Sequence, residues 1–403
     1  MFLEERRHQI LTYLDRHGRA SVEFLAKEFS VTRETIRSDL NALARMNLVQ
    51  RCHGGAIVIR RSLQSELITS GRENIEALLK RLEKHPRYQT MKNRGGRMSG
   101  KVCILGSFNV DIVAKVERFP KGGESLLALG SALGPGGKGA NQAMAASHAG
   151  ANVHFVSKVG KDQFSQFAYD HLSASAIHSF KLYQSETEPT GNAIIYVSQQ
   201  DGENMIAIYS GANKTITDDE IAEMMPELSD SDVLLLQLEN NFPATLNAIK
   251  LANALNIRVV LNPAPYSRDV LDCLEYIDVI TPNETEASLL SGVEVRDLDS
   301  AKDAAQKIVA LGARRVIITM GSRGALLFDN QQFQHIPAFP ALSVDTTGAG
   351  DAFNGAFAAA IATGQNLVQA ATYASAFASL AVEREGAANM PDHQQVKVRL
   401  SQR

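Results

Sequence analysis

Six short, almost wholly apolar segments alternate with helix-like stretches over the last three quarters of the chain. A parallel strand that is buried on both faces reads as a continuous apolar run, whereas a half-exposed strand alternates. Strands that alternate with helices indicate a parallel sheet covered by helices on both faces. The sequence therefore predicts a three-layer α/β/α domain, with strands in the segments KVCILGS, NVHFVSKVG, DVLLLQL, IRVVLNP, VITPN and RRVIITMG.

A different pattern interrupts these segments at residues 192–211, NAIIYVSQQDGENMIAIYSG. Apolar residues alternate on either side of Gln200, Asp201 and Gly202, which predicts a β-hairpin. In an α/β domain such a hairpin would project as a small β-lid or as a dimerising flap. Thr217 and Glu220 then form a capping-box pattern that predicts the start of a helix.

Charge divides the chain of 403 residues into two parts, although its formal net charge is only −3. Residues 1–100 hold 19 Lys and Arg against 11 Asp and Glu, a net +8, so the remainder carries −11. A basic part joined to an acidic part suggests two partners of opposite character. We divide the chain at residues 1–60, 61–100 and 101–403.

The first 60 residues are predicted to form short helices followed by a turn-rich pair of strands. Apolar residues recur at helical spacing, and Ser21 and Thr32 are placed to cap a second and a third helix. Helix, turn and helix is an arrangement whose second helix enters the major groove of DNA. The residues expected to face inward are Ile10, Leu11, Leu14, Phe24, Leu25, Phe29, Ile36, Leu40 and Leu43.

The runs TIRSDL and HGGAI within residues 6–56 resemble the winged helix-turn-helix of DeoR-type transcriptional regulators. This resemblance implies that DNA is a partner of the chain. The residues that would contact DNA are Thr32, Arg33, Thr35, Arg37 and Ser38 on the third helix, with Arg51 and His53 in the wing. Residues 61–100 are predicted to form a basic helical linker, which either adds salt-dependent attraction to phosphates or is simply solvated.

The run DTTGAGDAFNGAFAAA, residues 345–360, carries the strongest chemical signal. A glycine-rich turn that leads into a helix leaves backbone amides unpaired at the helix N-terminus, where an anion is favoured. The amides of Gly348, Ala349 and Gly350 are therefore predicted to bind a phosphoryl group. Asp351 places a carboxylate beside this anion hole, and its fitting task is to accept a proton from an attacking hydroxyl.

Three further motifs place polar side chains after strands, where ligands of α/β sheets bind. The glycines of GPGGKGANQA, residues 134–143, allow close approach to a ligand, and Lys138 adds a positive charge. Asn283 and Glu286 in TPNETEA suit phosphate oxygens and the water shell of Mg²⁺. The other residues in this group are Asn109 and Asp111 in GSFNVD, Asn141, Glu239, and Thr319, Gly321, Ser322 and Gly324 in TMGSRG.

Together these motifs resemble the ribokinase branch of the PfkB carbohydrate-kinase family from Val102 to Asp392, with DTTGAGD, GGKGAN, NPAP and TPNETEA in the family's order. The resemblance implies a ribokinase-like fold, with Asp351, Gly348, Ala349, Gly350 and Lys138 as catalytic residues. The sugar-binding residues would be Asn109, Asp111, Gly136, Gly137, Lys138, Asn141, Glu239 and Asp351. The ATP-binding residues would be Asn283, Thr319, Gly321, Ser322, Arg323, Gly324, Gly350 and Ser375.

The same resemblance implies two metal cofactors. Glu286 would hold Mg²⁺ through water, and a monovalent cation, K⁺, would be the activator. Met390 stands where the family pattern has a serine oxygen, which leaves the strength of potassium activation open. The monovalent-cation residues would be Asp345, Thr347, Ala381, Arg384 and Gly386.

The expected activity is ATP-dependent phosphorylation of the 5-hydroxyl of ribose or 2-deoxyribose, combined with DNA binding. The alternative is a transcription factor whose kinase-like body only senses a sugar or a nucleotide.

The helix-turn-helix of the first 60 residues and the predicted β-hairpin both favour a homodimer. Three widely spaced cysteines form no disulfide framework, and the absence of a signal-like or membrane-length apolar run makes a cytoplasmic location the expectation.

Overall fold

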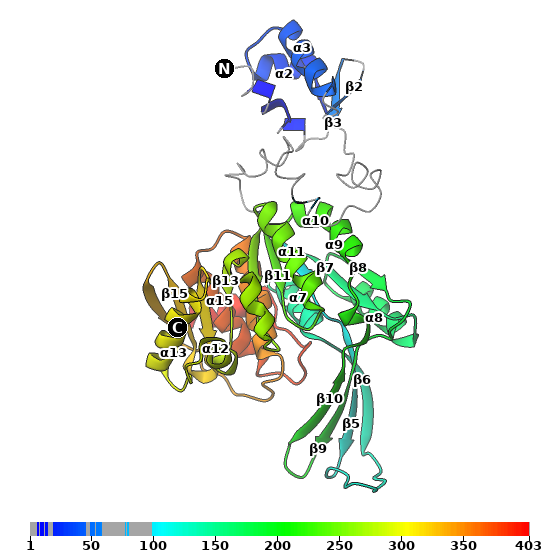
Figure 1. Ribbon diagram of the computed structural model, residues 1–403, viewed down its shortest axis with the longest axis vertical. Coiled ribbons are helices and arrows are strands. Elements are labelled where there is room, and N and C mark those ends of the chain that lie inside the picture. The colour runs from blue at the N-terminus through cyan, green and yellow to red at the C-terminus, as the bar shows by residue number, and fades with distance from the viewer. Residues whose placement is uncertain are drawn as a thin grey trace. The chain divides into compact units, whose positions relative to one another are not determined.

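The computed structural model describes residues 6–7, 9–11, 13–14, 19–45, 49–52, 54–58, 77, 79 and 99–402. The described residues belong to two compact units (Figure 1). We call residues 6–58 the head and residues 99–402 the body, and each is considered by itself. No helix in these described ranges is long and apolar enough to cross a membrane.

The head contains the predicted helix-turn-helix, with α2 at Val22–Glu28 and α3 at Arg33–Arg45. Ser21 caps α2 by accepting a hydrogen bond from the Phe24 N–H at 3.1 Å, and Thr32 accepts one from the Thr35 N–H at 3.2 Å. A small antiparallel sheet completes the winged fold in the order β1-β3-β2, made of Arg19–Ser21, Gly55–Val58 and Val49–Cys52.

The core of the head is apolar, and among the described residues of the head it contains one buried acid, Asp39. Ile36, Leu40 and Leu43 are buried as predicted. The prediction that Phe24 faces inward was wrong: its side chain is 39% exposed and its ring lies 4.8 Å from that of Tyr13. The core of so small a unit is filled by the other apolar residues, so Phe24 packs on the rim instead.

The body is built on a nine-stranded sheet in the order β16-β15-β14-β13-β12-β11-β4-β7-β8. The seven strands from β14 to β8 pair in parallel, which agrees with the prediction from the apolar segments. At one end of the sheet, β15 pairs antiparallel with β14 and the edge strand β16 pairs antiparallel with β15, so the sheet is mixed rather than wholly parallel. The strands are β4 Lys101–Leu105, β7 Asn152–Val159, β8 Ser179–Gln184, β11 Val233–Leu236, β12 Arg258–Leu261, β13 Val279–Ile280, β14 Val316–Thr319, β15 Ala325–Asp329 and β16 Gln332–Ile336.

Helices cover the sheet on both faces, as the three-layer prediction requires. On one face α14, Ala349–Ala362, packs between α7, Lys138–His148, and α15, Leu367–Ala381, and shares an apolar core with β4 and β11. Helix α11, Phe242–Ala254, contacts β11 and β12, while α13, Leu298–Ala310, contacts β14 and β15. The remaining helical elements are α8 Gln163–Ala174, η1 Gly211–Lys214, α9 Asp218–Glu223, α10 Met225–Ser229, η2 Arg268–Tyr276, α12 Glu284–Ser291, η3 Gly321–Arg323 and α16 His393–Ser401.

A second, four-stranded sheet extends away from the rest of the body (Figure 1), and we call it the lid. Its order is β10-β9-β5-β6, with β5 at Asn109–Val116, β6 at Gly130–Gly136, β9 at Asn192–Ser198 and β10 at Asn204–Tyr209. The predicted hairpin is β9–β10. The predicted capping box at Thr217 is also present and begins α9.

Candidate functional site

The glycine-rich turn at the start of α14 is tightly packed. Gly348 caps the helix with φ of +77°, and a Cβ there would lie 2.7 Å from the Ala387 Cβ, so only glycine fits. The Ala349 N–H donates to the Thr346 carbonyl at 3.2 Å. Of the three amides predicted to bind a phosphoryl group, those of Gly348 and Gly350 have no acceptor among the described residues, whereas that of Ala349 is already paired.

Asp351 lies in the first turn of α14 and is 6% exposed. Each of its carboxylate oxygens accepts one side-chain amide: Asn141 Nδ2 at 3.0 Å and Gln142 Nε2 at 3.0 Å. Burial raises the pKa of Asp351; Lys138 and the two amides lower it without fully offsetting the burial, so the pKa stays above its ordinary value. A buried carboxylate with a raised pKa is suited to accept a proton.

Lys138 begins α7 within reach of three carboxylates. Burial lowers the pKa of Lys138, but Asp351, Glu239 and Glu286 together raise it above its usual value, so the ammonium is charged at neutral pH. Glu239 in turn accepts the Lys138 backbone N–H at 2.9 Å and the Ser107 hydroxyl. The site therefore combines one positive charge with three nearby carboxylates.

The predicted sugar-side residues lie where the lid joins the body. Asp111 lies against Gly136, where a Cβ would come within 2.2 Å of the carboxylate. Burial and then Glu239 raise the pKa of Asp111 to about 6. Gly137 precedes α7 with φ of +90°.

The side chain of Asn109 is fixed by a residue that the sequence reasoning missed. Asn213, in η1 and 1% exposed, donates to Asn109 Oδ1 at 2.9 Å and to the Phe108 carbonyl at 3.1 Å, and it accepts the Phe108 N–H at 3.1 Å. No motif marked this asparagine; its only signal is its place directly after the hairpin.

The residues predicted to hold phosphate and Mg²⁺ lie on the neighbouring strands. Asn283 and Thr319 form a parallel bridge, so the turns after β13 and β14 lie side by side. Asn283 and Glu286 also form a capping box for α12, in which Glu286 accepts the Asn283 N–H at 2.9 Å. Burial outweighs this bond and Lys138, and it raises the pKa of Glu286.

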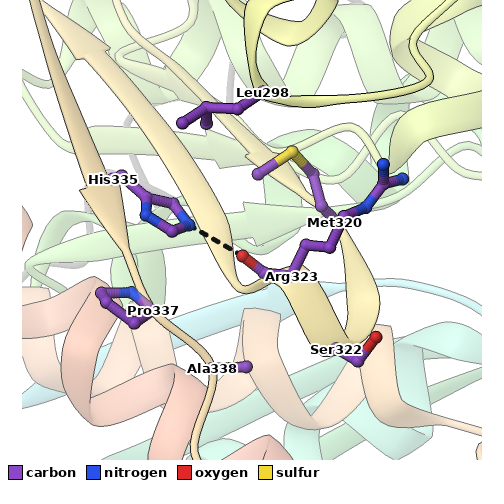
Figure 2. Close-up of a pocket in the computed structure, with 7 residues that line it drawn as sticks. All are labelled: Leu298, Met320, Ser322, Arg323, His335, Pro337 and Ala338. Atoms are coloured by element: carbon purple, nitrogen blue, oxygen red, sulfur yellow. Dashed lines mark hydrogen bonds between the residues drawn. The ribbon is translucent and has the colours of Figure 1, made fainter.

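A pocket of about 420 Å³ opens beside the turn after β14 (Figure 2). Ser322 and Arg323 were predicted for this side, and both line it. The Arg323 guanidinium, however, bonds Glu284 and the Arg296 carbonyl, while its own carbonyl lies 2.8 Å from His335 Nε2. The lining residues that the sequence reasoning missed are Leu298, Met320, His335, Pro337 and Ala338.

The other residues predicted to contact the nucleotide are placed as follows. Gly321 and Gly324 shape the turn, and a Cβ at Gly324 would lie 2.0 Å from the Ile336 carbonyl. Ser375 is buried in α15 and does not line the pocket.

The residues predicted for the monovalent cation form a hydrogen-bonded loop. Asp345 accepts the Thr347 N–H at 2.8 Å and the Gly386 N–H at 3.0 Å. Burial raises the pKa of Asp345, but the hydrogen bonds from Gly386 and Thr347 lower it by more, so the pKa lies below its ordinary value. The Ala381 carbonyl accepts the Arg384 N–H at 3.1 Å, and the Met390 carbonyl accepts Arg384 Nη1 at 3.0 Å.

In the head, the predicted DNA-facing side chains lie on the outer side of α3. Thr32, Arg33, Arg37 and Ser38 are exposed and Thr35 is half-buried. Arg33 pairs with Glu23 at 2.5 Å and Arg37 with Glu34 at 3.0 Å. His53 lies outside the described residues, and Arg51 is half-buried, with no partner for Nη1 among the described residues.

The body thus combines an α/β sheet with a glycine-rich helix start, a buried carboxylate beside it and a projecting four-stranded sheet. Residues 99–394 match the profile of the pfkB family of carbohydrate kinases, and residues 6–62 match the DeoR-like helix-turn-helix domain. The chain belongs to the PfkB family of carbohydrate kinases, as a ribokinase-type enzyme that carries a DeoR-like domain at its N-terminal side.

Individual relatives agree with this assignment. The chain is 38% identical to a ribokinase of Staphylococcus aureus, over 72% of this chain and 96% of the relative, and 35% identical to a deoxyribokinase of Salmonella typhi, over 71% and 93%. The solved ribokinase of Thermotoga maritima superposes with a TM-score of 0.68 at 36% identity, over 74% of this chain and 99% of that one. The ribokinase of Arabidopsis thaliana, solved with ribose and ATP, gives 0.67 at 31% identity, over 74% and 98%.

Proposed function

We propose that the body transfers the γ-phosphoryl group of ATP to the 5-hydroxyl of D-ribose or 2-deoxyribose. The observation that carries this proposal is the buried Asp351 beside the free amides of Gly348 and Gly350 and the charged Lys138. Ribokinases and a deoxyribokinase among the relatives support a pentose. Both names occur at similar identity, so the choice between the two sugars stays open.

In this mechanism Asp351 accepts the proton of the sugar hydroxyl while the oxygen attacks the γ-phosphorus in line. Charge that develops on the phosphoryl oxygens meets the Gly348 and Gly350 amides and the Lys138 ammonium. The lid would exclude water and thereby limit hydrolysis of ATP. We assign sugar binding to Asn109, Asp111, Gly136, Gly137, Asn141 and Glu239.

We assign the nucleotide to the turn after β14, with the purine in the 420 Å³ pocket beside Ser322. Pockets of this size that are mainly apolar suit a ring system. Asn283 and Glu286 fit the water shell of Mg²⁺, because both carry side-chain oxygens and lie beside the turn after β14. The Asn283 N–H holds one carboxylate oxygen of Glu286 in place. When bound, Mg²⁺ would neutralise phosphate charge.

We further propose a monovalent-cation site at the loop of Asp345, Thr347, Ala381, Arg384 and Gly386. The loop offers an ionised carboxylate and backbone carbonyls, which are the ligands that K⁺ takes up. The Met390 side chain supplies no oxygen and its carbonyl is held by Arg384, which favours weak activation.

We propose that the head binds duplex DNA through α3 and the wing, and that the chain acts as a homodimer. The exposed face of α3 and the match to the DeoR-like domain support DNA binding. On the lid, edge strand β10 is exposed throughout, with Met205, Ile206 and Ile208 each more than half exposed. Exposed apolar edges of this kind pair readily with a second copy. The division at residues 60 and 100 stays a prediction.

Asp351→Asn tests the base. We expect sugar phosphorylation to fall by about 10² to 10⁴-fold, because the amide cannot take the proton, while ATP binding stays the same. Asp303→Asn, an exposed acid on α13, is the matched control and should leave the rate unchanged. A near-normal rate in Asp351→Asn would refute the base assignment.

The second candidate is a sugar- or nucleotide-sensing transcription factor, which the complete helix-turn-helix favours. A sensor has no need of a charged lysine, an anion hole and a base in one place. Sugar-dependent turnover of ATP separates the two candidates.

A further inference from the structure

A chain of buried side-chain amides lies beneath Asp351. Its members are Gln142 in α7, Gln237 after β11 and Asn262 after β12, which are 0%, 2% and 6% exposed. Buried amides cost free energy unless their donors and acceptors are satisfied, so the partners of each atom are informative.

The directions of the hydrogen bonds among these three amides follow from the Asp351 carboxylate. An ionised Asp351 only accepts, so Gln142 must turn Nε2 toward it, at 3.0 Å from Oδ1. The same Nε2 donates to Asn262 Oδ1 at 3.1 Å, and Gln142 Oε1 accepts Gln237 Nε2 at 2.7 Å. Asn262 then donates to the Thr281 carbonyl at 3.2 Å. The orientations of the Gln237 and Asn262 amides therefore follow from that of Gln142, and so from the charge on Asp351.

The chain continues to the anion hole. The Thr281 hydroxyl donates to Asn354 Oδ1 at 2.5 Å, and Asn354 Nδ2 donates to the Gly350 carbonyl at 2.9 Å. Asp351 and the first turn of α14 are thus supported from one network that begins at the ends of β11, β12 and β13.

The charged groups around Asp351 do not by themselves favour its ionised form. Lys138 on α7 favours it, whereas burial and Glu239, after β11, oppose it. Glu286 on α12 adds a further negative charge in reach of Asp351. The amide donors of Asn141 and Gln142 therefore help Lys138 against burial and two acids.

We propose that Gln142, oriented by Gln237 and Asn262, is a positioning residue that keeps Asp351 ionised and aimed for proton transfer. This inference rests on the proposed role of Asp351 as the base. Gln142 does not contact substrate; it acts through the carboxylate.

Gln142→Met in the full chain is the direct test, because methionine has a similar volume but no hydrogen-bond donor, and its sulfur is only a weak acceptor. We expect the acid limb of the kcat profile to move up by about one pH unit or more, since an ionised carboxylate loses a hydrogen bond. At pH values above the shifted limb, kcat should return to within a few-fold of wild type, and the KM for ATP should not change.

Two further variants complete the test. Gln237→Met removes the donor that orients Gln142 without touching Asp351, and it should move the limb in the same direction by less. Gln166→Met, on the exposed side of α8, is the control and should leave the profile unchanged. If Gln142→Met does not fold, as judged by thermal melting, Gln237→Met decides.

A lowered kcat at every pH with an unmoved acid limb would overturn the proposal and leave Gln142 a purely structural residue. Asp351→Asn separates this failure from that of the proposed function. An inactive Asp351→Asn with an unmoved limb in the glutamine variants refutes only the positioning role. An active Asp351→Asn refutes the base itself.

Discussion

The head and the body place their functional side chains in opposite environments. In the head, the Arg33 and Arg37 side chains are 63% and 54% exposed, and each pairs with an acid of the head itself. In the body, Asp351 is 6% exposed and is surrounded by fixed donors. An exposed cation recognises a ligand by exchanging one partner for another, whereas a buried acid acts through its protonation state.

Each unit also contains a buried aspartate, and the two differ in their partners. Asp39 in the head accepts Arg6 at 2.7 Å and Arg7 at 2.9 Å, so its charge is fully paired and holds the fold together. Asp351 has two neutral amides and a lysine shared with other acids. A fully paired acid is structural, while an acid left with a raised pKa is available for chemistry.

Asp39→Ala gives the largest effect that this comparison predicts. Removing one partner of a buried ion pair leaves Arg6 and Arg7 without their acceptor and should cost the head about 3–5 kcal/mol. DNA binding, measured by fluorescence anisotropy, should be lost, while phosphorylation by the same preparation stays normal. Glu34→Ala, which breaks only the exposed pair with Arg37, should leave the stability unchanged; an equal loss there would contradict the comparison.

Lys138→Met should give the next largest effect. The ammonium stabilises charge that develops on the phosphoryl oxygens, so we expect kcat to fall about 10² to 10³-fold. Coupled measurement of ADP formation checks this, with Lys307→Met on the exposed side of α13 as the control. DNA binding should not change, and retention of more than a tenth of kcat would contradict the assigned role.

Arg33→Ala and Arg37→Ala should weaken DNA binding by about 1 to 3 kcal/mol each. The probe is duplex DNA from upstream of the protein's own gene, titrated at several salt concentrations. Each variant should also reduce the salt slope if the lost contact is to phosphate.

Glu23→Ala sharpens this prediction, because it removes the intramolecular competitor of Arg33 and should tighten binding. Lys27→Ala on α2 is the control for loss of charge alone. Equal losses in Lys27→Ala and Arg33→Ala would show that α3 has no special part in binding.

The smallest effect concerns Asp111, whose pKa is raised to about 6 by burial and Glu239. Below that pH the carboxyl is protonated and accepts the sugar hydroxyls less well than the ionised form does. The KM for the sugar should therefore rise by about fivefold as the pH falls through 6, since a bond to a charged group is the stronger one. In Asp111→Asn the KM should be high and independent of pH in this range; a dependence that persists would assign it to another group.

The fold of the body was predictable where burial is complete. Strand β11, with all four residues buried, reads as a continuous apolar run, whereas β8 and β16 are partly exposed and carry no such signal. The antiparallel end of the sheet could not be predicted: β15 is buried and apolar like the parallel strands, so its sequence does not show its direction, and the exposed edge strand β16 carries no apolar run. Phe24 shows the same limit in the head: the helical period alone did not distinguish the core from its rim.

The glycines and the charged residues of the site could be predicted from the sequence. Gly348 and Lys138 stand in motifs whose local geometry is evident from the residue types. Gln142, Asn213 and Asn262 were missed as functional residues, because a buried amide and a solvated one look alike in a sequence. Their roles depend on partners far away in the chain: Gln142 and Asp351 are separated by 209 positions, Asn262 and Gln142 by 120, and Asn213 and Asn109 by 104.

The central claim is that the body catalyses phosphoryl transfer to a pentose while the head binds DNA. The most direct measurement is ADP formation by the full chain with ATP and Mg²⁺, with and without ribose, 2-deoxyribose and other pentoses, together with identification of the phosphorylated carbon. The account predicts strong stimulation by ribose or 2-deoxyribose and a product phosphorylated at the 5-hydroxyl. Binding of a pentose without any stimulated turnover would contradict it and favour a sensor.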